Sequence, residues 1–182
     1  WMMTIGAWWF GTQHWSGAQF GAIFSTMGIA SLFMPAIAGI IADRFINAEK
    51  LYGFLHLCGA VMLFYIPHVG SPTAMFWVML LNMCFYMPTI SLSVAVSFSS
   101  MKDAGMDIVN EFPPIRVLGT VGFIVAMWTI SLLHLETSSF MFYIAGTASL
   151  ALGLYSFTMP KCPHLGKKTG TLISAIGLDA FK

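Results

Sequence analysis

Residues 116–135 read RVLGTVGFIVAMWTISLLHL, in which one cation is followed by 19 residues without a charged side chain. A helix that crosses the hydrocarbon core of a bilayer needs about 20 predominantly apolar residues. The length and composition of this segment therefore predict a membrane-spanning helix. The cation at its start, Arg116, is costly to place near lipid, and residues of this kind commonly mark a solute pathway.

The composition of the whole chain supports the same conclusion. Of its 182 residues, 58% are hydrophobic and 8% are charged, and the mean hydropathy is +0.81. Soluble domains carry about 25% charged residues, so we expect an integral, all-α membrane protein. The net charge of +1 provides no basic field for nucleic acid. The three cysteines have no metal-ligand spacing, so neither zinc nor disulfides are expected.

Charged residues and clusters of glycine and proline divide the chain into six predicted helices. These cover residues 1–10, 18–42, 49–66, 73–100, 113–135 and 138–159. The fifth is expected to begin at Pro113 or Pro114, because a proline in the first helical turn loses no hydrogen bond. Residues 1–10 are uncharged but cover only about 15 Å, half a membrane, so we expect the second half of a truncated helix.

The basic residues predict the orientation. Seven of them follow the second, fourth and sixth helices, and the other loops contain none. They are Arg44, Lys50, Lys102, Lys161, Lys167, Lys168 and Lys182. Cytoplasmic loops carry the excess of Lys and Arg, so the chain is predicted to enter and leave the bundle on the cytoplasmic side.

Residues 1–160 are therefore predicted to form one helical bundle and residues 161–182 the start of a cytoplasmic linker. Within the linker, residues 171–182 mix apolar and polar side chains at roughly helical spacing. This pattern fits an amphipathic segment on the membrane face. A disordered tail is an equal alternative.

Three side chains on the fifth predicted helix share one face. Arg116, Thr120 and Phe123 have the spacing i, i+4, i+7. A forked cation, a hydroxyl and an aromatic plane together can hydrogen-bond to a polar ring and stack on it. The alternative is that Arg116 snorkels to the headgroups and Phe123 faces lipid. The residues alone favour this alternative, because Arg116 is only about one turn from the predicted helix start.

The fourth predicted helix carries a polar stripe. Asn82, Tyr86, Thr89 and Ser93 follow one another at i, i+4, i+7 and i+11. They are candidates for lining a cavity, with Asn82 and Tyr86 as secondary candidates for substrate contact. The alternative is that they join helices by hydrogen bonds. Pro88 is expected to kink this helix.

Other features of the sequence indicate structural roles. His56 is a lone histidine in the third helix, for which a hydrogen-bonded packing role is preferred over proton transfer. Small residues on the second and fifth helices are expected to allow close helix contact; they are Gly21, Gly28, Gly39, Gly119 and Gly122. No nucleophile–base pair, paired carboxylates or phosphate loop is visible in the sequence, so no enzyme activity is predicted.

Two stretches resemble known families. Residues 39–45, GIIADRF, resemble the G-x-x-x-D-[RK] signature of the major facilitator superfamily, which implies that Gly39, Asp43 and Arg44 belong to a cytoplasmic gate. The glycine and basic pair that usually follow are replaced by INAEK at residues 46–50. The match is therefore partial.

The second resemblance is more specific. Residues 104–123, AGMDIVNEFPPIRVLGTVGF, look like the bacterial nucleoside permeases, which are nucleoside:proton symporters. MGIASLFMPA at 27–36 and YMPT at 86–89 are similar to that family too. The resemblance implies the N-terminal six-helix half of a twelve-helix transporter in the bacterial inner membrane.

The resemblance also implies site residues and an energy source. In that family the arginine, threonine and phenylalanine of this motif contact the nucleoside, which here are Arg116, Thr120 and Phe123. The acidic residue tied to proton coupling belongs to the C-terminal half, and the proton gradient takes the place of a cofactor. The alternatives are a carrier for a sugar or drug, and a scaffold that does not transport.

Overall fold

The apolar segments form α-helices in the computed structural model, whose described part is residues 1–162. Four of the helical segments are long and apolar enough to cross a membrane, and a fifth, α6, is apolar but shorter. The elements are α1 (Ile5–Gly11), α2 (Gly17–Arg44), α3 (Ala48–Tyr65), the short 3-10 helix η1 (Ile66–His68), α4 (Pro72–Asp103), α5 (Ile108–Leu132) and α6 (Phe140–Ser156). The predicted features of residues 163–182 lie outside the described residues.

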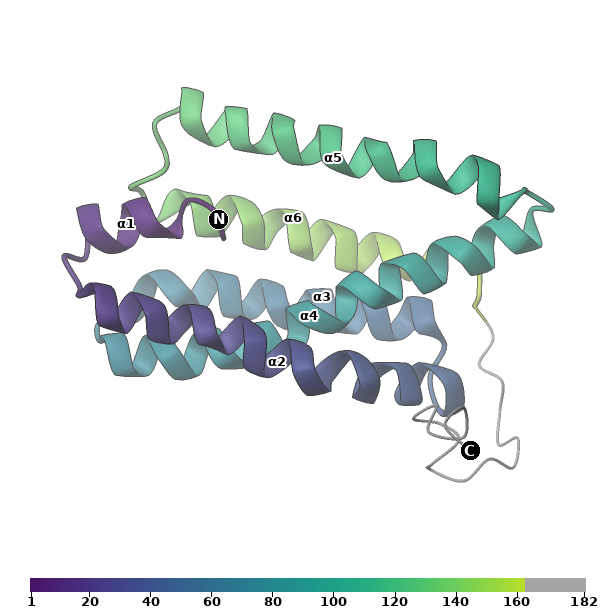
Figure 1. Ribbon diagram of the computed structural model, residues 1–182, viewed down its shortest axis with the longest axis horizontal. Helices are drawn as coiled ribbons and strands as arrows, with labels where there is room; N and C mark the ends of the chain where they lie inside the picture. The colour runs from purple at the N-terminus through teal and green to yellow at the C-terminus, as the bar shows by residue number, and fades with distance from the viewer. Residues whose placement is uncertain (163–182) are drawn as a thin grey trace.

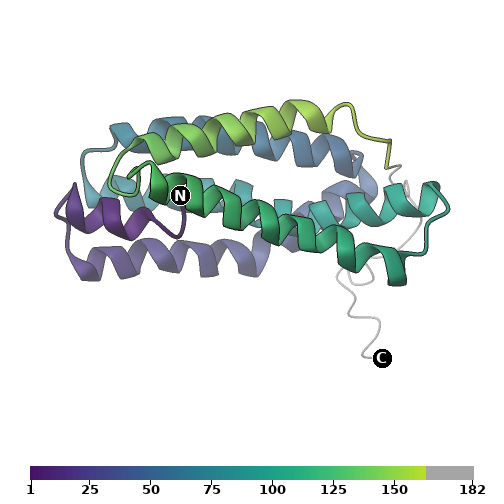
Figure 2. The same cartoon turned by 90° about the horizontal axis from the view of Figure 1, so that it is seen from above.

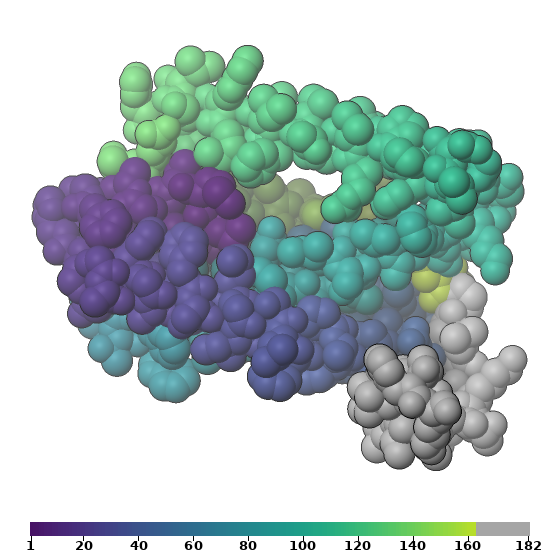
Figure 3. All heavy atoms as spheres, in the orientation of Figure 1, coloured from purple at the N-terminus to yellow at the C-terminus, as the bar shows by residue number. Residues whose placement is uncertain are grey.

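The long helices run side by side, and α4 is the centre of the arrangement (Figure 1). It packs against α2 on one side and α3 on the other, and α3 packs in turn against α6. Figure 2 shows α5 lying along the bundle in front of these helices. The principal neighbour of α5 is α4, and Ile130 is the buried residue within α5. Figure 3 shows an opening between α5 and the helices beneath it.

Two clusters of buried side chains hold the bundle together. The larger one joins α1, α2, α4 and α6 around Trp8, Trp9 and Phe142, which are all 0% exposed. The ring centroids of Trp8 and Phe142 are 5.2 Å apart in an edge-to-face arrangement, a favourable geometry for aromatic pairs. The second cluster joins α2, α3 and α4 through Ala38, Leu55, Tyr52 and other buried residues.

Helices α3 and α6 approach each other closely, and glycines make this contact possible. A Cβ added at Gly53 would lie 2.9 Å from the Gly153 carbonyl oxygen, and one at Gly153 would lie 2.9 Å from Leu57. The sequence predicts such contacts on α2 and α5, and the described residues do not make them there. A Cβ at Gly21, Gly28, Gly39, Gly119 or Gly122 would meet no described atom within 4 Å. The spacing of glycines in the sequence shows which helix faces are small, but it does not show which helix packs against each face.

The largest correction to the predicted boundaries concerns α5. This helix begins at Ile108, five residues before Pro113, and both prolines lie inside it. The start is fixed by Asp107, whose carboxylate accepts a hydrogen bond of 3.0 Å from the Val109 N–H, a favoured arrangement at helix N-termini. Arg116 therefore lies about 12 Å along the helix from its first residue, at 1.5 Å per residue, rather than one turn inside it.

The other ends differ less from the prediction. A reciprocal cap between Ser16 and Gln19 starts α2 at Gly17, and the Ser71 hydroxyl caps α4. Helix α6 begins at Phe140 after Ser139, which makes no side-chain cap, and it ends at Ser156, three residues before the predicted end. Pro88 lies inside α4, and Figure 1 shows that this helix changes direction along its length, as expected for a proline kink.

We expect Gly53→Ala to lower the thermal unfolding midpoint of the purified protein in detergent. The added methyl group meets a backbone oxygen of α6, so the two helices must separate, and overpacking of this kind costs about 1–3 kcal/mol. The matched control is Gly28→Ala on α2, where the methyl group has open space. An equal midpoint for the two variants would contradict the tight α3–α6 contact.

Candidate functional site

Arg116 lies in a small pocket between α5 and α4. The pocket has a volume of about 150 Å³ and includes Ser93 and Ser97 of α4 among its lining residues. Within residues 1–162, the structure gives Arg116 no ion pair or hydrogen bond. The guanidinium therefore offers its donors to whatever enters the space between the two helices.

The two serine hydroxyls can accept a hydrogen bond from a ligand, but their protons are already donated to backbone carbonyl groups. The Ser93 hydroxyl donates to the Ile90 carbonyl at 2.8 Å, and the Ser97 hydroxyl donates to the Ser93 carbonyl at 2.7 Å. Each hydroxyl oxygen retains lone pairs that a guanidinium or a ligand N–H can use. Ser97 was missed by the sequence analysis, although the polar stripe of α4 continues to it with a further step of four residues.

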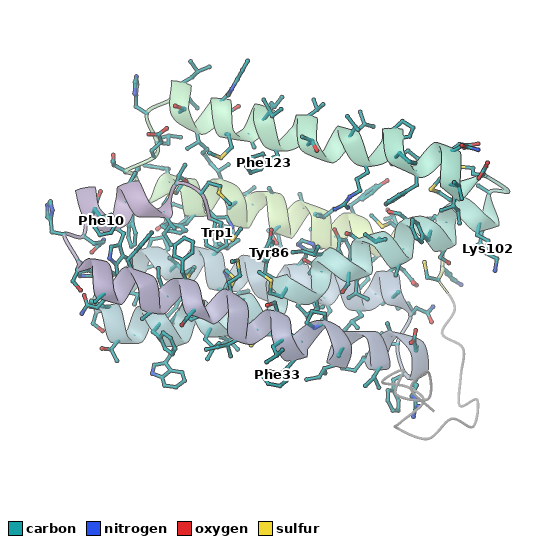
Figure 4. The ribbon with its side chains drawn as sticks, in the orientation of Figure 1. Trp1, Phe10, Phe33, Tyr86, Lys102 and Phe123 are labelled. Carbon is teal, nitrogen blue, oxygen red and sulfur yellow. The ribbon has the colours of Figure 1, made fainter. Side chains whose placement is uncertain are left out.

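The predicted common face of α5 is oriented toward the bundle. Phe123, a residue that is 53% exposed, is labelled in Figure 4 beneath α5, on the side of the opening. Thr120 is also exposed and lies between Phe123 and Arg116 on the helix. The three side chains are thus free for a ligand, as far as the described residues extend. Their contact with a substrate stays a prediction.

Asn82, Tyr86 and Thr89 line a different cavity from Arg116. This cavity, of about 280 Å³, lies between α3, α4 and α6, and also includes His56 and Trp1. The Tyr86 and Trp1 rings meet edge to face with centroids 6.5 Å apart. The stripe on α4 therefore divides, because Ser93 belongs to the Arg116 pocket. The structure does not bring Asn82 and Tyr86 into one pocket with Arg116.

The three residues of the predicted gate, Gly39, Asp43 and Arg44, lie together near the C-terminal end of α2. Gly39 and Asp43 line a pocket of about 260 Å³ that also includes Cys162. Arg44 follows in the last turn of α2, where a cation is favoured by the helix dipole. Their role in gating stays a prediction.

A buried carboxylate anchors the chain that follows α6. Glu49, at the start of α3, is 2% exposed. Its carboxylate accepts hydrogen bonds from the Cys162 N–H at 3.0 Å and from the Asn47 amide at 3.2 Å. The Ser156 hydroxyl donates to the Glu49 carbonyl at 2.6 Å. Sequence analysis missed this anchor, although a carboxylate in the first turn of an apolar helix was the available signal.

The surroundings of Cys162 affect its reactivity. Burial raises the pKa of its thiol, and the nearby carboxylates of Glu49 and Asp103 raise that pKa further, against a lowering by a hydrogen bond with Ser99. A thiol with a raised pKa is poorly nucleophilic at neutral pH. Within residues 1–162 there is no group of three or more His, Cys, Asp or Glu side chains that could hold a metal ion.

Comparisons with known proteins identify relatives over the whole chain. The family model described as "Nucleoside H+ symporter" matches residues 1–182. Xanthosine permease of Escherichia coli (strain K12) is 53% identical over 182 residues, which is all of this chain and 44% of that protein. Nucleoside permease NupG of the same organism is 43% identical, again over all of this chain and 44% of that protein.

A solved structure gives the same result for the fold. A crystal structure of the nucleoside transporter NupG matches with a TM-score of 0.94 and 43% identity, covering 100% of this chain and 45% of that one. The match confirms the predicted fold class, the N-terminal half of a major facilitator transporter. The chain spans less than half the length of the curated relatives it matches.

We expect Glu49→Ala to speed the reaction of Cys162 with a maleimide at neutral pH, in a protein whose Cys58 and Cys84 are replaced by alanine. The substitution removes one cause of the raised thiol pKa and one anchor of the backbone. A hydrogen bond to a charged group contributes about 1.5–3 kcal/mol, so the rate should rise about tenfold or more.

The rate is measured by mass spectrometry of the labelled protein over time. Glu111→Ala is the control, because Glu111 lies in the first turn of α5 and is not among the groups that act on the Cys162 thiol. Equal labelling rates in the Glu49 variant and the control would show that the anchor does not protect Cys162.

Proposed function

The chain belongs to the nucleoside H+ symporter family, and on that premise we propose that the complete protein carries nucleosides across the membrane together with protons. The observation that supports this most directly is the position of Arg116. It lies well inside an apolar helix, faces the bundle, and has no partner within residues 1–162. Such an intramembrane cation is expected to serve a ligand.

The chemistry of a nucleoside suits this face of α5. A nucleoside is neutral and combines a flat base with several hydrogen-bonding groups. Arg116 provides a planar fork of donors for base or sugar oxygens, and Thr120 provides a hydroxyl beside it. Phe123 offers an aromatic face on which a base can stack.

The second wall of the substrate cavity lies outside this chain in the proposal. Transporters of this superfamily hold the substrate near the bilayer midplane between two halves, which rock around it. The opening beside α5 (Figure 3) is the side on which that second half would complete the site. The group that carries the coupled proton is assigned to the same missing half, and the proton gradient rather than a cofactor supplies the energy.

The protein is a multi-pass membrane protein, and we propose the bacterial inner membrane as its location. The ends of α2 and α4 and the segment after α6 carry the basic residues, so these ends are assigned to the cytoplasm. Gly39, Asp43 and Arg44 then belong to the cytoplasmic gate. The buried Glu49 anchor lies at the same end and supports the gate by fixing the start of α3 to the chain after α6.

We expect Arg116→Ala to reduce nucleoside uptake by about tenfold to a hundredfold, because charged hydrogen bonds of about 1.5–3 kcal/mol are lost. Arg116→Lys should restore only part of the activity, since an ammonium group cannot bind in the forked geometry. Uptake of radiolabelled nucleoside by cells that express the complete protein is the measurement.

The control for this series is Lys102→Ala, which removes a cation from the cytoplasmic end of α4. Membrane levels of every variant are compared by immunoblot. Full uptake by the Arg116→Ala variant, at normal membrane levels, would return Arg116 to a snorkelling role and remove the main support for the proposed site.

We expect uptake of uridine, adenosine and xanthosine to collapse when a protonophore dissipates the proton gradient. Xanthosine is included because one relative is named for it. Uptake that persists after the gradient is lost would contradict proton coupling. Uptake of a hexose in place of nucleosides would favour a sugar carrier of the same superfamily.

A further inference from the structure

The side of α5 that carries Arg116 also carries an aromatic residue that contacts α4. Phe112, Ile115, Arg116 and Gly119 line the pocket between the two helices, and their spacing is i, i+3, i+4 and i+7. Positions with this spacing share one face of a helix. Phe112 therefore lies one turn before Arg116 on the same face, toward the loop that joins α4 to α5.

The ring of Phe112 packs against Phe98 of α4. The two ring centroids are 4.6 Å apart and the ring planes meet at 80°, which is an edge-to-face pair. This geometry is favoured between aromatic rings. Among the described residues, those that line the Arg116 pocket include Phe112 but not Phe98. Phe98 thus joins the two helices beside the pocket without forming part of its surface.

The aromatic pair lies within the hairpin of α4 and α5. Phe98 is five residues before Asp103, the last residue of α4, and Phe112 is the fifth residue of α5. The start of α5 is fixed in the same place, because the Asp107 carboxylate accepts from the Val109 N–H at 3.0 Å. The pair and the cap together hold the first turns of α5 against the end of α4.

Two prolines make the position of Arg116 depend on this support. Pro113 and Pro114 lie inside α5, between Phe112 and Arg116. A proline has no N–H, so two of the four backbone hydrogen bonds that would tie the turn of Arg116 to the preceding turn are missing. Arg116 makes one of the remaining bonds, because in an α-helix its N–H bonds to the carbonyl of Phe112. Whatever holds Phe112 therefore also holds the turn that carries Arg116.

We propose that Phe98 is a positioning residue for Arg116. Its ring holds Phe112 against α4, and Phe112 sets where α5 places the guanidinium. The inference rests on the proposed function, in which this guanidinium binds the nucleoside. Without the ring of Phe98, every donor and acceptor of the pocket is still present, but the turn with Arg116 can shift. A binding group is effective only while packing holds it in the productive geometry.

The test compares Phe98→Ala with Phe98→Tyr in the complete protein. The Kd for uridine is measured by titration calorimetry in detergent, and the unfolding midpoint is measured without ligand. We expect Phe98→Ala to raise the Kd about threefold to tenfold, as for the loss of an edge-to-face pair. Phe98→Tyr keeps the ring, and the residue is 38% exposed, so its hydroxyl has room and the Kd should match that of the unchanged protein.

The matched control is Phe33→Ala, which removes another exposed phenylalanine. Phe33 is 57% exposed and is labelled in Figure 4 beneath α2, on the other side of the bundle from α5. Its removal should leave the Kd for uridine unchanged. A rise in Kd as large as that of Phe98→Ala would show a general effect of losing an apolar ring and would overturn the inference.

A second comparison separates positioning from general packing. If Phe98 acts through Arg116, then Phe98→Ala has no further effect once the guanidinium is absent. In the Arg116→Ala background the added substitution should change the Kd by less than about twofold. An equal loss of affinity with and without Arg116, or a lower unfolding midpoint with an unchanged Kd, shows a packing role only and overturns the inference.

A measurement without nucleoside keeps this inference separate from the transport function. Spin labels are attached to the complete protein through Gly21→Cys and Arg116→Cys, with its other cysteines replaced, because Gly21 has open space around it. The distance distribution between the labels, measured by pulsed electron paramagnetic resonance, should broaden with Phe98→Ala and not with Phe33→Ala. An unchanged distribution overturns the positioning role even if uridine binds. A broadened distribution in a protein that binds no nucleoside supports the positioning role and overturns the transport function alone.

Discussion

The hydrocarbon core of a bilayer contains no water to bond with polar groups, and this constraint explains most of the structure. Every spanning segment becomes a helix because its backbone bonds must close within the segment. The hydroxyl side chains obey the same constraint. Thr26, Ser91 and Ser97 each donate to a carbonyl of their own helix. Among residues 1–162, the buried side-chain atoms without a hydrogen-bond partner are Nε2 of His56 and Nδ2 of Asn82, and the exposed guanidinium of Arg116 makes no ion pair or hydrogen bond.

Helix packing distributes these atoms between two places. The α3–α6 contact is tight because glycines allow the backbones to approach, and α4 fills the space between α2 and α3. The cavity with His56 and Asn82 lies inside this well-packed part. Arg116 instead lies on α5, the candidate span of which the smallest share is buried, in the pocket between α5 and α4.

The anchor at Glu49 shows the same constraint at the membrane end of the bundle. A carboxylate that is 2% exposed needs hydrogen-bond donors. The Cys162 backbone N–H and the Asn47 side-chain amide provide them. The cost of burying it is offset only while the chain after α6 stays in position. This coupling connects the start of α3 with the segment that leads out of the bundle, next to the residues of the proposed gate.

The sequence by itself determined the features that depend on neighbouring residues. These include the membrane class, the apolar segments, the common face of Arg116, Thr120 and Phe123, and the family, which the comparisons confirm. Periodicity and local motifs are properties of a single segment, so they can be read without a partner. One local prediction was nevertheless wrong. The prolines were expected to mark the start of α5, but Asp107 caps the helix several residues earlier.

Only the tertiary structure decided which faces meet. It placed the close glycine contacts between α3 and α6, divided the polar stripe of α4 between two pockets, and joined residues far apart in sequence. The pairs His56–Ser149 and Glu49–Cys162 are separated by 93 and 113 residues. Such contacts arise from the packing of whole helices, and a single sequence contains no local signal for the partner that a side chain will meet.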